Sequence, residues 1–172
     1  MVVDSFIKTF TKIFLLTDPR KHRVAGVFIV RDMLITPKGF DATYSSKEKT
    51  LTPWMQLILS MEREVIQVMP ELIEEGKTAE LCFLGIHPDY RGNRISNSLV
   101  KGALPLCKRN GFKFATIEAT SYFTSKAAQF HGFKEVFSIN VEDRLWIDQA
   151  LKSTAEEPHG KWKFWVKNLE TL

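Results

Sequence analysis

The feature that most constrains this sequence lies near its middle, where an apolar segment leads through a short polar turn into an amphipathic one. Residues 80–87 are mostly apolar, which predicts a β-strand, and residues 94–110 place apolar side chains at helical spacing. The first amide groups of such a helix have no internal partner, and the helix dipole is positive there. The turn at 89–94 is therefore a candidate phosphate site, to which Arg91 and Arg94 add charge. Taken alone, the same residues would also suit a plain strand-to-helix connection.

The rest of the chain alternates between helix and strand patterns. Thr52-Pro53 is a favourable helix start, and Pro70 is expected to interrupt the same helix near its end. The order of the elements predicts a mixed α/β (α+β) sheet flanked by helices, in a single domain covering residues 1–172. The expected helices are 2–14, 50–75, 94–110 (with Pro105 kinking or breaking it) and 121–131, and the expected strands are 23–33, a weaker one at 34–44, 80–87, 112–120, 133–141 and 161–169.

Composition narrows the class of protein. With 44% hydrophobic residues the chain can bury one sizeable core. The net charge of +4 suits an anionic ligand, but there is no block of like charges, so we expect no nucleic-acid partner. The two cysteines and four histidines lack metal-ligand spacing, which predicts no metal site. We expect no membrane partner and a cytoplasmic location, because cysteines are few and no signal peptide is recognisable.

The turn and its flanks resemble the acetyl-CoA-binding motif of the GNAT family of N-acetyltransferases, V-x-P-x-Y-R-G-x-G-I-G/A-x-x-L. The resemblance implies that backbone amides of the turn hold the pyrophosphate of acetyl-CoA. It also implies that the preceding strand splays at a bulge around residues 84–86, and that the pantetheine arm lies along its edge. The matching residues are Ile86, Pro88, Tyr90, Arg91, Gly92, Ile95 and Leu99, and the implied cofactor-binding residues are Leu84, Gly85, Ile86, Arg91, Gly92, Asn93, Arg94, Ile95 and Ser96.

Two later segments resemble the arylalkylamine N-acetyltransferases of invertebrates. They are residues 120–124 (TSYFT) followed by Gly132-Phe133, and the pair Pro158-His159. The resemblance implies a monomer or weak dimer that acetylates a small primary amine of the dopamine, tyramine or serotonin class, with a polyamine or another small amine as alternatives. The amine would attack the thioester directly, with backbone amides near Ile86 stabilising the oxyanion.

The sequence departs from this family in three places. Arg94 stands where the motif has its second glycine; we expect it to keep α-helical angles with its side chain pointing outward, the alternative being an altered phosphate site. Phe14 stands where the subfamily has its general-base glutamate. The opening edge strand has no counterpart. A catalytically impaired protein that still binds acetyl-CoA is therefore the alternative to an active enzyme.

Glu118, Thr120 and Thr124 are the candidate catalytic residues. Glu118 shares a strand face with Thr120 and would act as base through a water, or would be an ordinary solvated or salt-bridged glutamate. Thr120 and Thr124 occupy positions of subfamily serines that lie near the thioester, although Thr120 would equally suit a helix N-cap. The candidate substrate-binding residues are Phe14, Trp54 and His159, with Trp54 alternatively in the core and His159 alternatively an ordinary loop residue.

Overall fold

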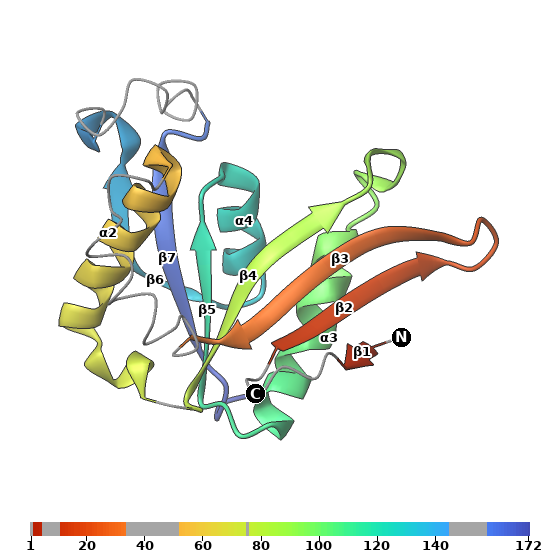
Figure 1. Ribbon diagram of the computed structural model, residues 1–172, viewed down its shortest axis with the longest axis horizontal. Coiled ribbons are helices and arrows are strands. Elements are labelled where there is room, and N and C mark those ends of the chain that lie inside the picture. Colours follow the sequence, from red (N-terminus) through yellow and green to blue (C-terminus); the bar gives the residue numbers. More distant parts are fainter. Residues whose placement is uncertain (1, 5–10, 34–51, 75, 145–157) are drawn as a thin grey trace.

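The computed structural model describes residues 2–4, 11–33, 52–74, 76–144 and 158–172. They form one seven-stranded sheet in the order β1-β2-β3-β4-β5-β7-β6 (Figure 1). Only β4 and β5 run parallel in it, so the expected mixed sheet is confirmed. The strands are β1 (Val2–Asp4), β2 (Thr11–Asp18), β3 (Arg23–Asp32), β4 (Thr78–Ile86), β5 (Phe114–Ala119), β6 (Lys134–Asn140) and β7 (Lys161–Asn168).

Helices cover both faces of this sheet. One core cluster joins α3 and α4 to strands β3, β4 and β5, and the other joins α2 to β6 and β7. Each helix buries a single apolar face, which is how amphipathic helices stabilise a sheet. The helices are α2 (Pro53–Val68), α3 (Ile95–Arg109) and α4 (Tyr122–Phe130), with 3-10 turns η3 (Pro70–Ile73), η4 (Pro88–Tyr90) and η5 (Val141–Arg144).

Local signals place the helix ends where the sequence predicts them. The side chain of Thr52 caps α2, accepting a hydrogen bond from the Met55 amide at 3.4 Å, and Pro70 begins η3 directly after α2. Gly111 has a φ of +91° just past α3, the conformation in which glycine ends helices. Pro105 lies inside α3 without breaking it, because Ala103, Leu104 and Cys107 are buried around it.

The N-terminal expectations were wrong. Instead of a helix over residues 2–14, the described residues Val2–Asp4 form β1 and Thr11–Asp18 form β2. β1 pairs with β2 at the sheet edge, so the edge strand expected to be missing is present. The apolar residues have helical spacing, but antiparallel pairing with β3 extends along all of β2 and favours the strand. The weaker strand expected at 34–44 lies outside the described residues.

Strand β4 separates from β5 after its third residue. The parallel pairing covers only Thr78 to Glu80, whereas β3 stays paired with β4 as far as Ile86. Residues 81–86 of β4 therefore present an edge that has no strand partner among the described residues, which confirms the predicted splay. The bulge lies at Cys82 and not at 84–86, because Leu81 pairs with Val30 while Phe83 pairs with Ile29.

Gly26 on β3 lets α3 approach the open end of the sheet. A Cβ at Gly26 would lie 2.9 Å from side-chain atoms of both Ile86 and Ile95. The absence of a side chain thus allows the first turn of α3 to pack beside the end of β4. No helix among the described residues is both long and apolar enough to cross a bilayer.

Candidate active site

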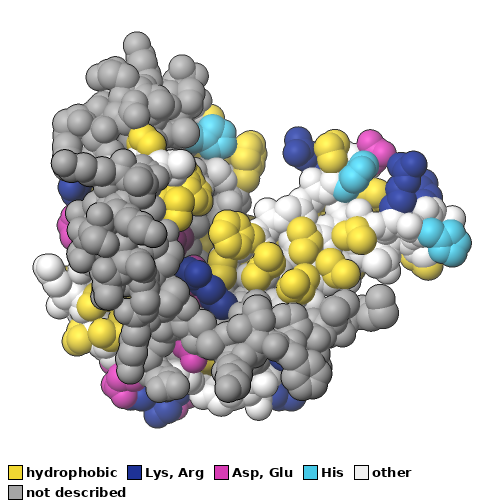
Figure 2. Space-filling model, in the orientation of Figure 1, with side chains coloured by type: hydrophobic (Ala, Val, Ile, Leu, Met, Phe, Trp, Pro, Cys, Tyr) yellow, Lys and Arg dark blue, Asp and Glu magenta, His cyan; other side chains and the backbone are white. Residues whose placement is uncertain are grey.

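A cavity of about 380 Å³ occupies the gap between the diverging strands β4 and β5. It reaches α2 on one face of the sheet and α3 and α4 on the other, so residues from both layers form its walls. Figure 2 shows hydrophobic side chains gathered in the hollow between the body of the molecule and the arm formed by β2, β3 and β4. The apolar wall includes Trp54, Ile58, Phe83, Leu84 and Ile117, and the polar wall consists of Arg31, Glu62, Glu80, Cys82, Glu118, Thr120 and Thr124.

Beyond the open end of β4, the turn into α3 exposes backbone donors. Within the described part of the chain, the amides of residues 92–97 have no acceptor, and the first bond of α3 is from the Ser98 amide to the Arg94 carbonyl at 3.2 Å. The side chains of residues 91–94 are exposed, so they do not fill the turn. Free amides at a helix start form the geometry that binds phosphate groups.

The shape of this turn depends on two residues with positive φ. Gly92 has a φ of +79° and Arg94 a φ of +56° with ψ of +24°, which is the left-handed region. The expectation that Arg94 keeps α-helical angles was therefore wrong. Arg94 takes the conformation that a glycine would adopt at lower energy, because the turn must reverse direction before α3 begins.

Hydrogen bonds hold the turn in place from below. The Asn93 amide group donates to the carbonyls of Tyr90 (3.1 Å) and Arg91 (3.3 Å). The Tyr90 hydroxyl donates to Asp18 at the end of β2, at 3.1 Å. These side-chain contacts do not use the amides of residues 92–97.

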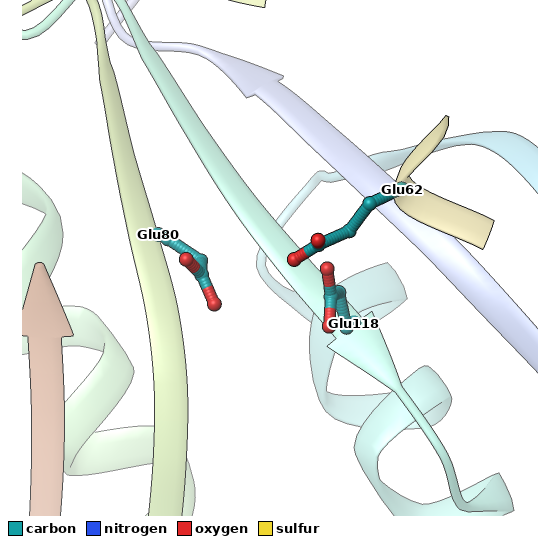
Figure 3. Close-up of side chains that lie close together, drawn as sticks. All are labelled: Glu62, Glu80 and Glu118. Atoms are coloured by element: carbon teal, nitrogen blue, oxygen red, sulfur yellow. The ribbon is translucent and has the colours of Figure 1, made fainter. Parts of the chain in front are cut away.

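Three carboxyl groups meet in the cavity, on separate elements. Glu62 comes from α2, Glu80 from β4 and Glu118 from β5, and one oxygen of each lies within 4.8 Å of the others. Figure 3 shows Glu62 and Glu118 pointing toward one another, with Glu80 facing them from the neighbouring strand. Like charges this close repel, so the cluster favours binding a proton or a cation.

Glu80 forms an ion pair with an arginine. Its two oxygens accept from Nε and Nη2 of Arg31 at 2.7 and 3.0 Å, and the Glu80 side chain is only 5% exposed. A bidentate pair of this kind satisfies a buried carboxylate. Glu80 is therefore a fixed charge in the wall of the cavity.

The surroundings of Glu118 raise the pKa of its carboxyl group. Burial raises its pKa well above the ordinary value, the charges of Glu62 and Glu80 raise it further, and a hydrogen bond with Glu62 adds to the effect, against the opposing charge of Arg31. Its Oε1 is buried and has no hydrogen-bond partner among the described residues. A raised pKa makes the ionised form of this carboxyl group a stronger base than an ordinary glutamate.

Cys82 lies in the same wall but is a poor nucleophile. Burial raises the pKa of its thiol, and the charge of Glu80 raises it further, so the thiol stays protonated. Because the thiolate is the reactive form, this side chain is not suited to form a covalent acyl intermediate.

Known proteins share this architecture. Residues 57–133, which extend from α2 past the end of α4, match the model of the Acetyltransferase (GNAT) family. The structure of arylalkylamine N-acetyltransferase 2 from Aedes aegypti superposes with a TM-score of 0.72 at 16% identity, over 92% of this chain and 73% of that one. This protein has the GNAT fold.

Two further structures agree with the GNAT assignment. Mosquito arylalkylamine N-acetyltransferase like 5b gives a TM-score of 0.68 at 22% identity, over 91% of this chain and 74% of that one. Drosophila melanogaster polyamine N-acetyltransferase, which forms N-acetylagmatine, gives a TM-score of 0.66 at 15% identity, over 91% of this chain and 74% of that one. At these identities the superpositions establish the fold.

The cavity gathers all three predicted catalytic residues but only one of the three predicted substrate contacts. Glu118, Thr120, Thr124 and Trp54 line it, and the Trp54 ring also packs edge-on against Trp162, with centroids 6.2 Å apart. Leu84 lines it too, with Gly85 and Ile86 following on the same open segment of β4. The N-cap of α4 is Ser121 and not Thr120, because the hydroxyl oxygen of Ser121 accepts a hydrogen bond from the Thr124 amide at 3.2 Å. The hydroxyl oxygens of Ser121 and Thr124 lie 2.9 Å apart.

Phe14 and His159 lie apart from the residues that line the cavity. Phe14 is on β2 and packs against the core cluster that contains α3. His159 accepts a hydrogen bond from the Tyr122 amide at 3.4 Å and lies 5.7 Å from the ring of Phe123. It therefore lies at the start of α4.

Sequence reasoning missed Arg31, Glu62 and Glu80 among the residues that line the cavity. A signal for Glu62 was present, since Trp54, Ile58 and Glu62 follow at intervals of four and so share a helix face. Glu80 also stands out as an acidic residue between apolar neighbours in a strand. What the sequence did not provide is their meeting with Glu118, because the three positions are far apart in the chain.

Proposed function

We propose that this protein transfers the acetyl group of acetyl-CoA to a small primary amine. The observation that carries the proposal is the open segment of β4, which has free backbone donors at one end and a partly buried proton acceptor, Glu118, beside the other. A GNAT acetyltransferase needs these two elements on one path, so that the phosphates and the thioester are held at a fixed separation.

The chain's own groups fit acetyl-CoA. The unpaired amides of residues 92–97 and the side chains of Arg91 and Arg94 suit a diphosphate. Along residues 81–86 the unpaired strand edge offers backbone groups to an extended amide chain such as pantetheine, and amides near Ile86 would stabilise an oxyanion. When bound, acetyl-CoA supplies the activated acetyl group.

Glu118 would take the proton of the amine. An amine with a lysine-like pKa of about 10.4 is neutral in only about one molecule in 2,500 at pH 7, so a base is needed. One proton would move from the ammonium to Glu118, and the neutral amine nitrogen would then bond to the acetyl carbon. The bond from that carbon to sulfur would break, and the departing sulfur would take the second proton of the nitrogen, giving the amide and free CoA. Thr120 and Thr124 line the same wall, and we expect them to hydrogen-bond the reacting groups.

The acceptor we propose is an arylalkylamine. Trp54, Ile58 and Phe83 supply an apolar and aromatic wall beside the carboxyl groups, which suits an aromatic ring carrying a short amine. Other small amines, including polyamines, would use the carboxyl groups without the aromatic wall and are kept as alternatives for the test.

The test combines binding with turnover. We expect acetyl-CoA to raise the melting temperature, and release of free CoA to accelerate with tyramine, dopamine or serotonin more than with agmatine or spermidine. A Glu118→Gln variant should keep the melting shift and lose the turnover. A melting shift without accelerated CoA release for any amine would show a protein that binds acetyl-CoA and has no transferase activity. No melting shift would reject the cofactor as well.

A further inference from the structure

Helix α2 carries a carboxylate into the cavity on the same stripe as its aromatic wall. Trp54, Ile58 and Glu62 follow one another at intervals of four residues and all line the cavity. The adjacent stripe, Leu57 and Met61, is fully buried against β6 and β7, so the rotation of the helix is fixed. Glu62 is therefore held over the gap between β4 and β5 by core packing.

The position of Glu62 determines the surroundings of Glu118. An oxygen of Glu62 lies within 4.8 Å of oxygens of both Glu118 and Glu80. Glu80 is already bound by Arg31 through two hydrogen bonds, so its charge is largely balanced. The side chains of Glu62 and Glu118 point toward each other (Figure 3).

We propose that Glu62 is a positioning residue for the proton acceptor: α2 holds its carboxylate beside that of Glu118 and so makes Glu118 a stronger base for the incoming amine. This inference rests on the proposed acetyl transfer. A proton that reaches Glu118 relieves the repulsion between the two carboxylates and is shared through their hydrogen bond, so its transfer from the ammonium becomes more favourable. The helix that forms the aromatic wall thereby also sets the basicity of the site.

Besides Glu62, three charged or titratable side chains of the described residues line the cavity around Glu118. Glu80 and Cys82 come from β4 and Arg31 from β3, and among these the Glu80 charge acts in the same direction as Glu62 while Arg31 opposes it. Removing Glu62 should therefore weaken the base without abolishing it. Removing Glu118 should abolish it.

The direct test is a carboxyl titration by ¹³C NMR of the protein labelled at glutamate side chains. The Glu118 signal is identified as the one lost in Glu118→Gln. We expect Glu62→Gln to move the titration of Glu118 to lower pH and Glu62→Asp to restore part of the difference. Glu64→Gln is the matched control, because Glu64 lies on the same helix but pairs with Arg144 at 3.0 Å, outside the cavity; it should leave the titration unchanged.

Turnover gives a second readout that a purely structural role would not move. In Glu62→Gln the acidic limb of the kcat/KM profile should shift to lower pH and the plateau should fall, because a weaker base accepts the proton less readily. An unchanged Glu118 titration in Glu62→Gln, or an equal shift in Glu64→Gln, would overturn the inference even in an active enzyme. A shifted titration in a protein that acetylates no amine would instead reject the proposed function.

Discussion

The two ends of the open segment of β4 differ in how their binding groups are made. At its C-terminal end the turn into α3 is exposed and offers backbone amides, with arginines beside them. At its N-terminal end Glu80 is buried, and it meets Glu62 and Glu118 in a side-chain cluster drawn from three elements. One end is suited to an anion and the other to a proton or a cation. The same strand can therefore hold the two halves of a transfer reaction apart.

This difference also predicts how each end responds to change. Charges in the cavity interact through a medium of low polarity, whereas those on the exposed turn are screened by water and salt. Backbone amides remain when side chains are replaced, whereas a cluster of carboxyl groups changes its charge when a single glutamate is replaced. We therefore expect large effects from substitutions in the cavity and small ones from substitutions in the turn.

The largest effect is expected from Glu118→Gln. Loss of a positioned base should lower kcat by about 10²- to 10⁴-fold, while binding of acetyl-CoA at the distant turn should persist. Steady-state kinetics with the best amine and the melting shift with acetyl-CoA measure the two ends separately. If the variant kept more than half of the wild-type rate, the base would have to be sought elsewhere.

Replacing Arg31, which pairs with Glu80 in the carboxyl cluster, should destabilise the fold. In Arg31→Met the buried Glu80 carboxylate loses its bidentate partner, and the free energy of unfolding should fall by about 3–5 kcal/mol. The double variant Arg31→Met/Glu80→Leu should recover much of this loss, since no buried charge remains. Urea denaturation of the wild type and of both variants decides the point. Equal stability of the single and double variants would show that Glu80 is not held as a charged group.

At the turn, Gly92→Ala should have a smaller effect. The new Cβ would meet no atom within 4 Å, so the penalty is only that of a left-handed residue, about 1–2 kcal/mol in stability. Acetyl-CoA binding should weaken several-fold as the turn relaxes. Gly102→Ala, inside α3 and equally unobstructed, is the matched control and should stabilise by about 0.5–1 kcal/mol. Destabilisation by both would point to crowding and not to backbone strain.

The smallest effect is expected from Arg94→Gly. Glycine removes the left-handed strain at φ +56° but loses more freedom on folding, so the free energy of unfolding should rise by less than about 1 kcal/mol. Arg94→Ala keeps the strain and should not be stabilised. Comparison of the two unfolding curves separates backbone strain from the lost charge. A more stable Arg94→Ala would mean that the guanidinium group, and not the backbone, is the source of the penalty.

The sequence alone determined the features that are encoded locally. The strand, turn and helix around Gly92 are contiguous, and so are the signals at Thr52, Pro70 and Gly111, because a cap or a turn is satisfied by residues only a few positions away. Glu118 was also recognised, through its alternation with Thr120 along a strand. Its role as base stays a prediction.

Tertiary structure decided what depends on residues distant in the chain. Residues 11–14 form a strand because β3 pairs with them, despite apolar spacing that suits a helix. Arg94 takes a left-handed conformation because the turn must join β4 to α3 beside Gly26. The carboxyl cluster exists only because packing brings α2 over the gap between β4 and β5, and a charge acquires its strength from neighbours that no local pattern specifies.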